Sequence, residues 1–335
     1  MNLLLKIKVL IKKIIFCLFK KFAKKHTLTR DSIVINQTAW ELFDKSQCDD
    51  SRFDFISVNS FSEIDKKSYD KIIAYIGGDI EKALLKELPN LKWLQLSSHG
   101  FNGFDKKELY PTDNIAVTNM HGIFSEPIAT FCITAWYVFH CPAFHRRTSH
   151  NVIRYNDTTT GEKISVLIYG LGDIGNKIAK TCSALSWKVY GVKRTIPEHA
   201  PTYIDKIVSF EDSMLYLSQC DYVINILPES SETNRIFDLQ FFSQMKQSAL
   251  FCNVGRGSSV VDEDLEYAVQ NGIIKGAILD AANPYSYNHP NIILTNHSSS
   301  FSAQNNQRIN ALFSSQLKAF LSNGINDLAY KVPLE

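Results

Sequence analysis

Three glycines stand at the spacing that lets a chain wrap a phosphate group. They follow the apolar run of residues 164–169 and precede a segment with helical patterning. The first glycine permits a tight turn, the second lets backbone approach a pyrophosphate, and the third lets helix and strand pack closely. The amino end of the helix adds unpaired N–H groups. The sequence therefore predicts a dinucleotide-binding loop rather than a fortuitous glycine-rich turn. Its residues are Gly170, Gly172, Asp173, Ile174 and Gly175.

A basic turn, Lys193, Arg194 and Thr195, ends the next predicted strand. NAD-selective sites usually place Asp or Glu here, where it accepts hydrogen bonds from the ribose hydroxyls. A carboxylate would repel a 2′-phosphate, whereas a guanidinium can bind it with two parallel hydrogen bonds. The turn therefore predicts NADP (NADPH) as the cofactor in preference to NAD. A solvated basic turn is the alternative.

Two further side chains, Arg256 and His297, follow predicted buried strands and could carry chemistry. A guanidinium offers a planar fork to a carboxylate, and an imidazole exchanges protons near neutral pH. Taken alone, the ordinary interpretations are favoured, a surface arginine and a hydrogen-bonded loop histidine. Their place in a longer series of motifs, described below, reverses that preference.

The histidine and cysteine spacings predict no metal site. His140, His145 and His150 recur every five residues, a spacing that does not put them on one helical face. The seven cysteines contain no C-x-x-C pair, which argues against a zinc ribbon and against a disulfide framework. We expect reduced thiols in a cytoplasmic protein.

Strand-like and helix-like segments alternate along the chain and must position these residues. Such alternation predicts parallel sheets with helices on both faces, and its length fits two such units. The fold class is therefore α/β. Strands are expected at 32–36, 53–58, 71–76, 91–97 and 115–118, and again at 164–169, 187–192, 221–227, 249–254, 276–280 and 292–295. Helices are expected at 82–88, 125–140, 176–185, 240–245 and 262–271.

Over roughly residues 70–335, the ordered motifs resemble those of the D-isomer-specific 2-hydroxyacid dehydrogenases. Within that family the glycine loop, the basic turn and the segment 122–129 are most similar to the glyoxylate/hydroxypyruvate reductase subgroup. The remaining matches are Leu227-Pro228 with Thr233 (the loop beside the nicotinamide), Asn253-Val254-Gly255-Arg256-Gly257 with Asp262 (the arginine motif), and Gly276 to Asp280 with Thr295 to His297 (the closing pair).

The resemblance implies two doubly wound, Rossmann/flavodoxin-like lobes, with the cofactor lobe inserted into the substrate lobe. The dinucleotide-binding Rossmann domain would span 120–297, and the substrate (catalytic) domain 31–119 and 298–335. The implied activity is NADP(H)-dependent reduction of small 2-oxoacids to D-2-hydroxyacids, glyoxylate- or hydroxypyruvate-like. A homodimer is implied as well.

The resemblance also implies a role for each matching residue. Arg256 would bind the substrate carboxylate and carbonyl, and His297 would donate the proton that reduction needs. The backbone N–H groups of Ser98, His99 and Gly100 would complete the carboxylate site, unless they form an ordinary turn. Asp280 would lie near the nicotinamide carboxamide. The other residues expected to contact the cofactor are Leu227, Pro228, Thr233, Val254 and Gly255.

One family residue is missing. A catalytic glutamate normally lies between the closing motifs, but residues 281–296 contain no Asp or Glu. Asn283 is the nearest match, and it could orient His297 without balancing the charge of the imidazolium. Two outcomes follow: an enzyme with a more acidic optimum for reduction, or a catalytically silent NADP(H)-binding regulatory or scaffolding protein at a membrane surface.

The charge is unevenly distributed along the chain. Residues 1–30 hold eight lysines, Arg30 and no acid, whereas the other 305 residues carry 27 basic and 34 acidic side chains. The acidic body gives no reason to expect nucleic-acid binding. The basic segment, residues 1–30, predicts an amphipathic helix whose residues 1–25 lie on an anionic membrane or pack on protein. Its longest apolar run, residues 14–19, is far shorter than the ~20 residues that span a bilayer.

Overall fold

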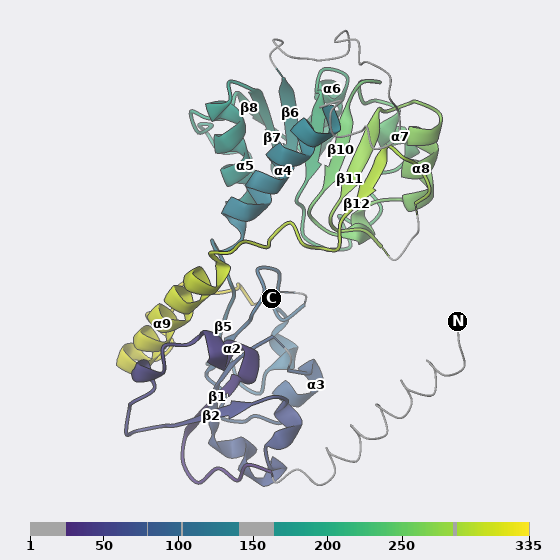
Figure 1. The fold of residues 1–335 in the computed structure, drawn as a ribbon. Coiled ribbons are helices and arrows are strands. Elements are labelled where there is room, and N and C mark those ends of the chain that lie inside the picture. The colour runs from purple at the N-terminus through teal and green to yellow at the C-terminus, as the bar shows by residue number, and fades with distance from the viewer. Residues whose placement is uncertain (1–24, 79, 102, 141–163, 284–286, 335) are drawn as a thin grey trace, which may run out of the picture. The chain divides into compact units, whose positions relative to one another are not determined.

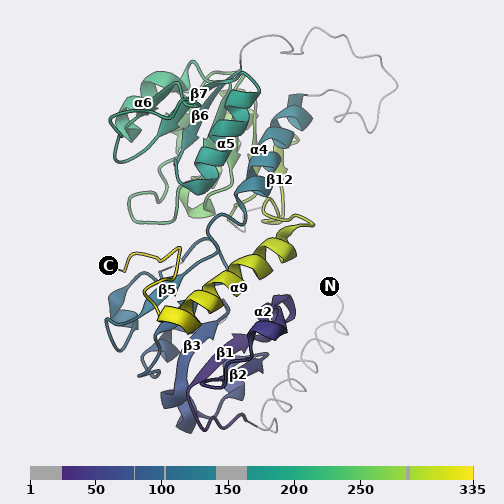
Figure 2. The same ribbon diagram turned by 90° about the vertical axis from the view of Figure 1, so that its left-hand side faces the viewer.

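The computed structural model describes residues 25–78, 80–101, 103–140, 164–283 and 287–334. The chain forms two compact units, which divide between His121 and Gly122 and again between Asn305 and Asn306. The second unit is thus one continuous segment inserted into the first. Figures 1 and 2 show the units as ribbons, with the second unit coloured teal to yellow-green.

A five-stranded parallel sheet, in the order β2-β1-β3-β4-β5, forms the centre of the first unit. Its strands are β1 (Ser32–Asn36), β2 (Asp54–Val58), β3 (Ile72–Ile76), β4 (Trp93–Gln95) and β5 (Ala116–Thr118). Its helices are α2 (Gln37–Leu42), α3 (Lys82–Leu85) and α9 (Asn305–Asn323), with short 3-10 turns η1 (Lys45–Gln47), η2 (Phe61–Glu63), η3 (Lys66–Lys71) and η4 (Lys107–Leu109).

Helix α9 packs on this sheet through aromatic side chains. Phe313 stacks on Phe43 with ring centroids 5.3 Å apart, and Phe320 lies 5.1 Å from Trp93 of β4. Figure 2 shows α9 running along the unit. The returning C-terminal segment therefore completes the core that the first 121 residues begin.

The second unit is built on a seven-stranded parallel sheet in the order β12-β11-β10-β9-β6-β7-β8. Its strands are β6 (Ser165–Tyr169), β7 (Lys188–Val192), β8 (Lys206–Val208), β9 (Tyr222–Asn225), β10 (Leu250–Asn253), β11 (Gly276–Leu279) and β12 (Ile292–Leu294). Its helices are α4 (Ser125–His140), α5 (Asp173–Ala184), α6 (Phe210–Leu217), α7 (Leu239–Phe242) and α8 (Asp262–Gln270), with the 3-10 turn η6 (Gly257–Ser259).

Alternate residues of each central strand in this unit enter different cores. In β6, Val166 and Ile168 belong to a cluster with residues of α4 and α5, whereas Leu167 and Tyr169 belong to a cluster with α6, α7 and α8. Side chains of a strand alternate between the two faces of its sheet, so helices cover both faces (Figure 1). The predicted fold class, α/β with two parallel-sheet units, is confirmed.

Several elements were not predicted from the sequence, among them α2, β8, α6 and α9. Most of the predicted basic helix, residues 1–24, lies outside the described residues, and residues 25–30 are not helical. There His26 forms an isolated parallel bridge with Ile64. Among the helices that the structure describes, none is both long and apolar enough to cross a membrane.

Candidate functional site

All seven strands of the second sheet end in a single register row. The row consists of their last residues, Val208, Val192, Tyr169, Asn225, Asn253, Leu279 and Leu294. Because the strands are parallel, the loops that follow them leave from the same edge of the sheet. Ligands bind in parallel α/β sheets at this edge, where the strand order reverses. Here the reversal is at β6. The edge therefore gathers the loops that carry Gly170, Arg194, Leu227, Arg256, Asp280 and His297.

The glycine turn between β6 and α5 has the geometry expected of a phosphate loop. Gly170 adopts a φ of 104°, a region that L side chains rarely enter. A Cβ on Gly175 would lie 1.9 Å from the carbonyl oxygen of Gly170. No atom lies within 4 Å of the Cβ position of Gly172. Two of the glycines thus permit the turn, and the middle one leaves open space beside it.

Helix α5 begins without a side-chain cap at Gly172. The Asn176 side chain stabilises the first turn of this helix, because its Nδ2 donates to the carbonyl oxygens of Leu171 (2.9 Å) and Gly172 (2.8 Å). Ser125 of α4 donates a hydrogen bond to the Asp173 carboxylate. Uncapped N–H groups at a helix start are available to an anion. This amino end therefore fits a pyrophosphate.

The basic turn after β7 contacts an acidic residue, Glu232, that was not among the predicted site residues. Lys193, Arg194 and Thr195 are exposed, and the Arg194 guanidinium forms an ion pair with Glu232. Glu232 lies in the loop after β9, directly before Thr233. Its place within the predicted Leu-Pro-x-x-x-x-Thr motif was the available signal.

Two buried asparagines at the strand ends hold the neighbouring loops together. Asn225 Nδ2 donates to Asn253 Oδ1 (2.9 Å) and to Ser259 Oγ (2.8 Å). Asn225 Oδ1 accepts from the Leu227 amide (3.0 Å), and Asn253 Oδ1 accepts from the Gly255 amide (3.1 Å). These side chains fix where the loops after β9 and β10 begin. Asn225 was not predicted, and its burial shows only in the folded sheet.

The loop after β9 is a compact turn built by Thr233. Thr233 Oγ1 donates to the Pro228 carbonyl (2.7 Å) and accepts from the Ser230 amide (2.9 Å). This loop also touches the next one, because a Cβ on Gly255 would lie 2.8 Å from the carbonyl oxygen of Leu227. Leu227, Pro228, Thr233 and Gly255 are thus brought together, as is Val254, whose amide donates to the Asn225 carbonyl (3.0 Å).

Arg256 follows β10 at the start of η6 and is partly buried. Its backbone carbonyl accepts hydrogen bonds from Ser259 Oγ (2.7 Å) and Asn253 Nδ2 (3.1 Å), and its Nη1 donates to the Gly255 carbonyl (2.8 Å). Hydrogen bonds thus hold both the backbone of Arg256 and one nitrogen of its guanidinium, a planar group with five N–H donors.

The Asp280 carboxylate is buried and organises the loop that carries His297. Its Oδ1 accepts from Thr295 Oγ1 (2.5 Å), the Ser298 amide (2.8 Å) and the Ser299 amide (3.1 Å), and its Oδ2 accepts from Ser299 Oγ. His297 lies within this loop, exposed and with a φ of 51°. One carboxylate thus shapes the backbone on both sides of the predicted proton donor.

Asn283, the nearest sequence match to the expected glutamate, forms its hydrogen bonds with a different loop. Its Nδ2 donates to Asp262 Oδ2 (2.9 Å) and to the Gly257 carbonyl (3.3 Å), and the Tyr287 hydroxyl also donates to Asp262. A Cβ on Gly257 would lie 2.6 Å from the Asn283 amide nitrogen. The donors of Asn283 therefore bind the start of α8 to the loop of Arg256.

Ser98, His99 and Gly100 belong to the first unit, where they follow β4. Ser98 Oγ donates to the Gly100 carbonyl (2.6 Å), and the Met120 amide donates to the Ser98 carbonyl (3.0 Å). The His99 ring stacks on His121 with centroids 5.6 Å apart. These bonds give the segment a defined turn.

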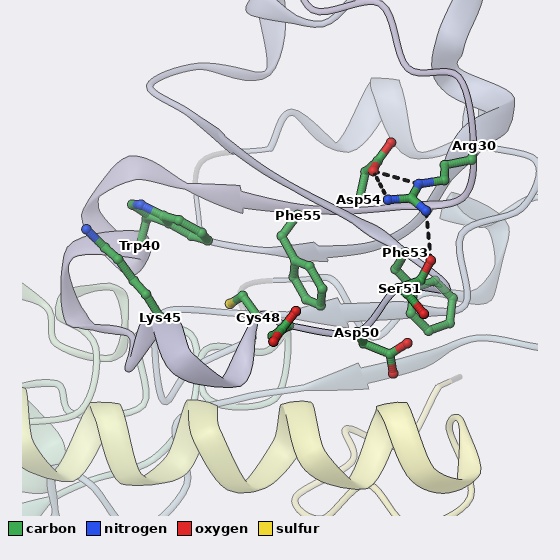
Figure 3. A pocket seen from close by; sticks show the side chains of 10 residues that line it. Arg30, Trp40, Lys45, Cys48, Asp50, Ser51, Phe53, Asp54 and Phe55 are labelled. Carbon is green, nitrogen blue, oxygen red and sulfur yellow. Dashed lines mark hydrogen bonds and ion pairs between the residues drawn. The ribbon is translucent and has the colours of Figure 1, made fainter.

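The first unit also contains a cavity of about 380 Å³ that none of the predicted site residues line (Figure 3). Arg30 at its rim binds Asp54 (2.5 Å) and the Ser51 carbonyl (2.7 Å). Burial, with a smaller contribution from Asp44, raises the pKa of the Cys48 thiol to about 11. A thiol that stays protonated at neutral pH is a poor nucleophile.

His140 and the cysteines do not enlarge the candidate site. His140 Nδ1 lies 3.0 Å from the Trp136 carbonyl oxygen, and His145 and His150 lie outside the described residues. The described cysteines are free thiols, namely Cys48, Cys132, Cys182, Cys220 and Cys252.

Solved structures share the fold over nine-tenths of the chain. A D-isomer specific 2-hydroxyacid dehydrogenase family protein from Aeromonas salmonicida superposes with a TM-score of 0.75 at 21% identity, covering 92% of this chain and 100% of that one. The NADPH-dependent glyoxylate/hydroxypyruvate reductase from Sinorhizobium meliloti, solved with NADP and malonate, superposes with a TM-score of 0.69 at 21% identity, covering 92% of this chain and 99% of that one. A Xanthobacter autotrophicus family member, solved with NADPH and MES, gives 0.74 at 19% identity (91% and 98%).

A sequence match accompanies the shared fold. Residues 140–299 match the family model described as the NAD binding domain of D-isomer specific 2-hydroxyacid dehydrogenases. This range contains the glycine turn, Arg256 and His297. The resemblance predicted from the motifs is therefore confirmed over this range, which is similar to the NAD binding domain of the D-isomer specific 2-hydroxyacid dehydrogenase family.

Proposed function

We propose that the chain is an NADP(H)-dependent reductase of small 2-oxoacids, glyoxylate- or hydroxypyruvate-like, which oxidises D-2-hydroxyacids in the reverse direction. The supporting observation is the common register row of the strand ends. The loops that carry the glycine turn, Arg256 and His297 all begin at this one edge of the sheet. Two similar structures hold NADP or NADPH, and one of these also holds malonate, a small dicarboxylate.

The residues at this edge fit a dinucleotide. Gly172 leaves open space beside the uncapped start of α5, where a pyrophosphate would bind. Lys193, Arg194 and Thr195 offer two cations and a hydroxyl to a 2′-phosphate. When bound, the reduced nicotinamide supplies the hydride. The residues proposed to line that end are Leu227, Pro228, Thr233, Val254, Gly255 and Asp280.

Arg256 is proposed to bind the substrate. Its guanidinium forms a planar fork that matches a carboxylate, and its charge polarises the neighbouring carbonyl. Asn253 and Ser259 hold its backbone, so the side chain starts from a fixed point. The backbone N–H groups of Ser98, His99 and Gly100 are proposed as further donors to the substrate carboxylate.

His297 is proposed to donate a proton to the substrate oxygen. Reduction of a 2-oxoacid places negative charge on that oxygen, and a positioned acid lowers the barrier by supplying the proton. Asp280 acts indirectly, because its carboxylate accepts hydrogen bonds from the Thr295 hydroxyl and from the Ser298 and Ser299 amides and so holds the loop that carries His297. We therefore regard His297 and Arg256 as the catalytic residues and Asp280 as a positioning residue.

The missing glutamate supports a second proposed function. Residues 281–296 contain no acid, and the donors of Asn283 face Asp262 and Gly257. The competing proposal, which the missing acid favours, is a catalytically silent NADP(H)-binding regulatory or scaffolding protein at a membrane surface.

Turnover measurements separate the two proposals. We expect NADPH-dependent reduction of glyoxylate, hydroxypyruvate or phenylpyruvate between about pH 5 and pH 8, with a rate that falls roughly 10²–10⁴-fold in His297→Ala. Arg256→Gln should raise KM as well as lower kcat. NADPH binding without turnover of any of these acids would contradict the enzyme and support the regulator.

Two further proposals concern partners. The family resemblance supports a homodimer, which sedimentation would test. The basic segment 1–25 supports peripheral binding to anionic membranes, which should be lost from vesicle co-sedimentation when these residues are deleted. Retained binding after the deletion would contradict that role.

A further inference from the structure

The basic turn that is proposed to bind a 2′-phosphate already has an acidic partner. Glu232 forms an ion pair with Arg194, although 38 residues separate them in the sequence. The sequence places no carboxylate at the end of β7, the position where NAD-selective sites have one. The fold therefore brings a carboxylate to the same turn from the loop after β9.

The position of Glu232 is fixed by the turn that contains it. Thr233, the next residue, bonds to both Pro228 and Ser230 through its side chain. Its amide also donates to the Ser230 carbonyl (3.3 Å). These bonds of Thr233 hold the backbone next to Glu232. They therefore keep the Glu232 carboxylate within reach of Arg194.

The ion pair itself is weak enough to be exchanged. The side chains of Arg194 and Glu232 are 81% and 67% exposed, and exposed pairs of this kind are worth little because water and salt screen them. A phosphate dianion binds a guanidinium more strongly than one exposed carboxylate does. A 2′-phosphate could therefore take Arg194, but it must displace Glu232 and tolerate its charge nearby.

From this arrangement we infer that Glu232 is a specificity-determining residue, which competes with the 2′-phosphate of NADPH for Arg194. NADH lacks this phosphate, so its binding leaves the pair intact. Glu232 accordingly narrows the preference for NADPH over NADH and lets the protein accept both. This inference rests on the proposed function, since it needs a nucleotide bound at the glycine turn.

The experiment compares NADPH and NADH dissociation constants, measured by fluorescence titration on the full chain. Glu232→Gln should bind NADPH about two- to fivefold more tightly, the range that loss of an exposed ion pair gives, with NADH unchanged. Glu229→Gln, a substitution in the same loop, is the matched control and should change neither. The Glu232→Gln effect should shrink at high salt.

Arg194→Gln supplies the second half of the test. It should weaken NADPH binding about tenfold or more, leave NADH unchanged, and remove the effect of Glu232→Gln in the double variant. A Glu232→Gln effect that persists without Arg194 would overturn the competition. So would unchanged NADPH affinity in Glu232→Gln. If neither nucleotide binds the unaltered protein, the proposed function fails, and the inference fails with it.

Discussion

The two ends of the candidate site are constructed in opposite ways. The turn at Gly170 to Gly175 works through missing side chains: a Cβ on Gly175 would meet backbone at 1.9 Å, and Gly172 leaves space. The loop around His297 works through an added side chain, because buried Asp280 accepts four hydrogen bonds from it. Steric rules govern the first end and hydrogen bonding governs the second, so they should fail differently.

The largest effect is expected at the glycine turn. Gly175→Val places atoms on the Gly170 carbonyl, which is backbone and cannot swing away. We expect a loss of unfolding free energy on the order of 3 kcal/mol and loss of NADPH binding, measured by thermal unfolding and titration. Gly172→Ala is the control and should keep its melting temperature. Equal losses of stability in both variants would remove the steric distinction between them.

A substitution at Asp280 tests the second end. Asp280→Asn replaces one of the two acceptor oxygens by a donor and removes the charge that the surrounding N–H and O–H groups bind, so we expect a loss of about 2 kcal/mol. The rate of reduction should fall more than NADPH affinity does, because the disturbed loop carries His297. A large loss of NADPH affinity with unchanged kcat would contradict the positioning role and leave Asp280 only its proposed contact with the nicotinamide end of the cofactor.

Placing a glutamate at position 283 should not increase the rate of turnover. In Asn283→Glu the new carboxylate would face Asp262, the acceptor to which Asn283 now donates. Like charges at this distance repel, and we expect a loss of about 1 kcal/mol without faster turnover. Asn283→Ala removes the hydrogen bonds without adding charge and so separates the two causes. A faster Asn283→Glu enzyme would show that position 283 reaches His297.

The smallest effect lies at the opposite end of strand β9. Burial alone would raise the pKa of Asp221, but hydrogen bonds from Lys246 and Ser165 and the charge of Lys246 lower it. A carboxyl whose pKa is lower in the folded state stabilises the fold above its unfolded pKa of about 3.9, and that stability disappears as the pH falls through the folded pKa.

Asp221→Asn should therefore cost about 1 kcal/mol at pH 7 and close to nothing at the acid end. Chemical unfolding from about pH 7 down to pH 2 would measure the difference between the two proteins. Nucleotide binding should not change, because Asp221 precedes β9 and the site follows it. A difference that persists at the lowest pH would contradict the charge account.

Local sequence patterns predicted the strands well because each pattern records burial. Helix α4 was predicted at its observed bounds, 125–140, and the ends of the strands that were predicted lie at most two residues from the observed ends. Helix α9 was missed although Leu312, Phe313, Leu317 and Phe320 are buried at helical spacing. Polar residues at its start, residues 304–308, obscured that pattern.

The candidate site was only partly predictable. Gly170, Arg256 and His297 were identified because their residue types follow buried strands in motif order. The roles of Asn225 and Glu232 were not, since both depend on contacts across the sheet edge. The contacts of Asn283 were likewise invisible, because they involve Asp262, 21 residues away.

The sequence by itself determined the α/β alternation, the glycine turn and the absence of an acid between residues 281 and 296, because each is a matter of residue type along one short segment. Only the tertiary structure decided which partners the polar side chains have. The parallel register brings the ends of all seven strands, β6 to β12, to one row, and there Arg194 meets Glu232 and Asp280 meets the loop of His297. Hydrogen bonds and ion pairs act over a few ångströms, so they follow distance in the folded chain and not separation in the sequence.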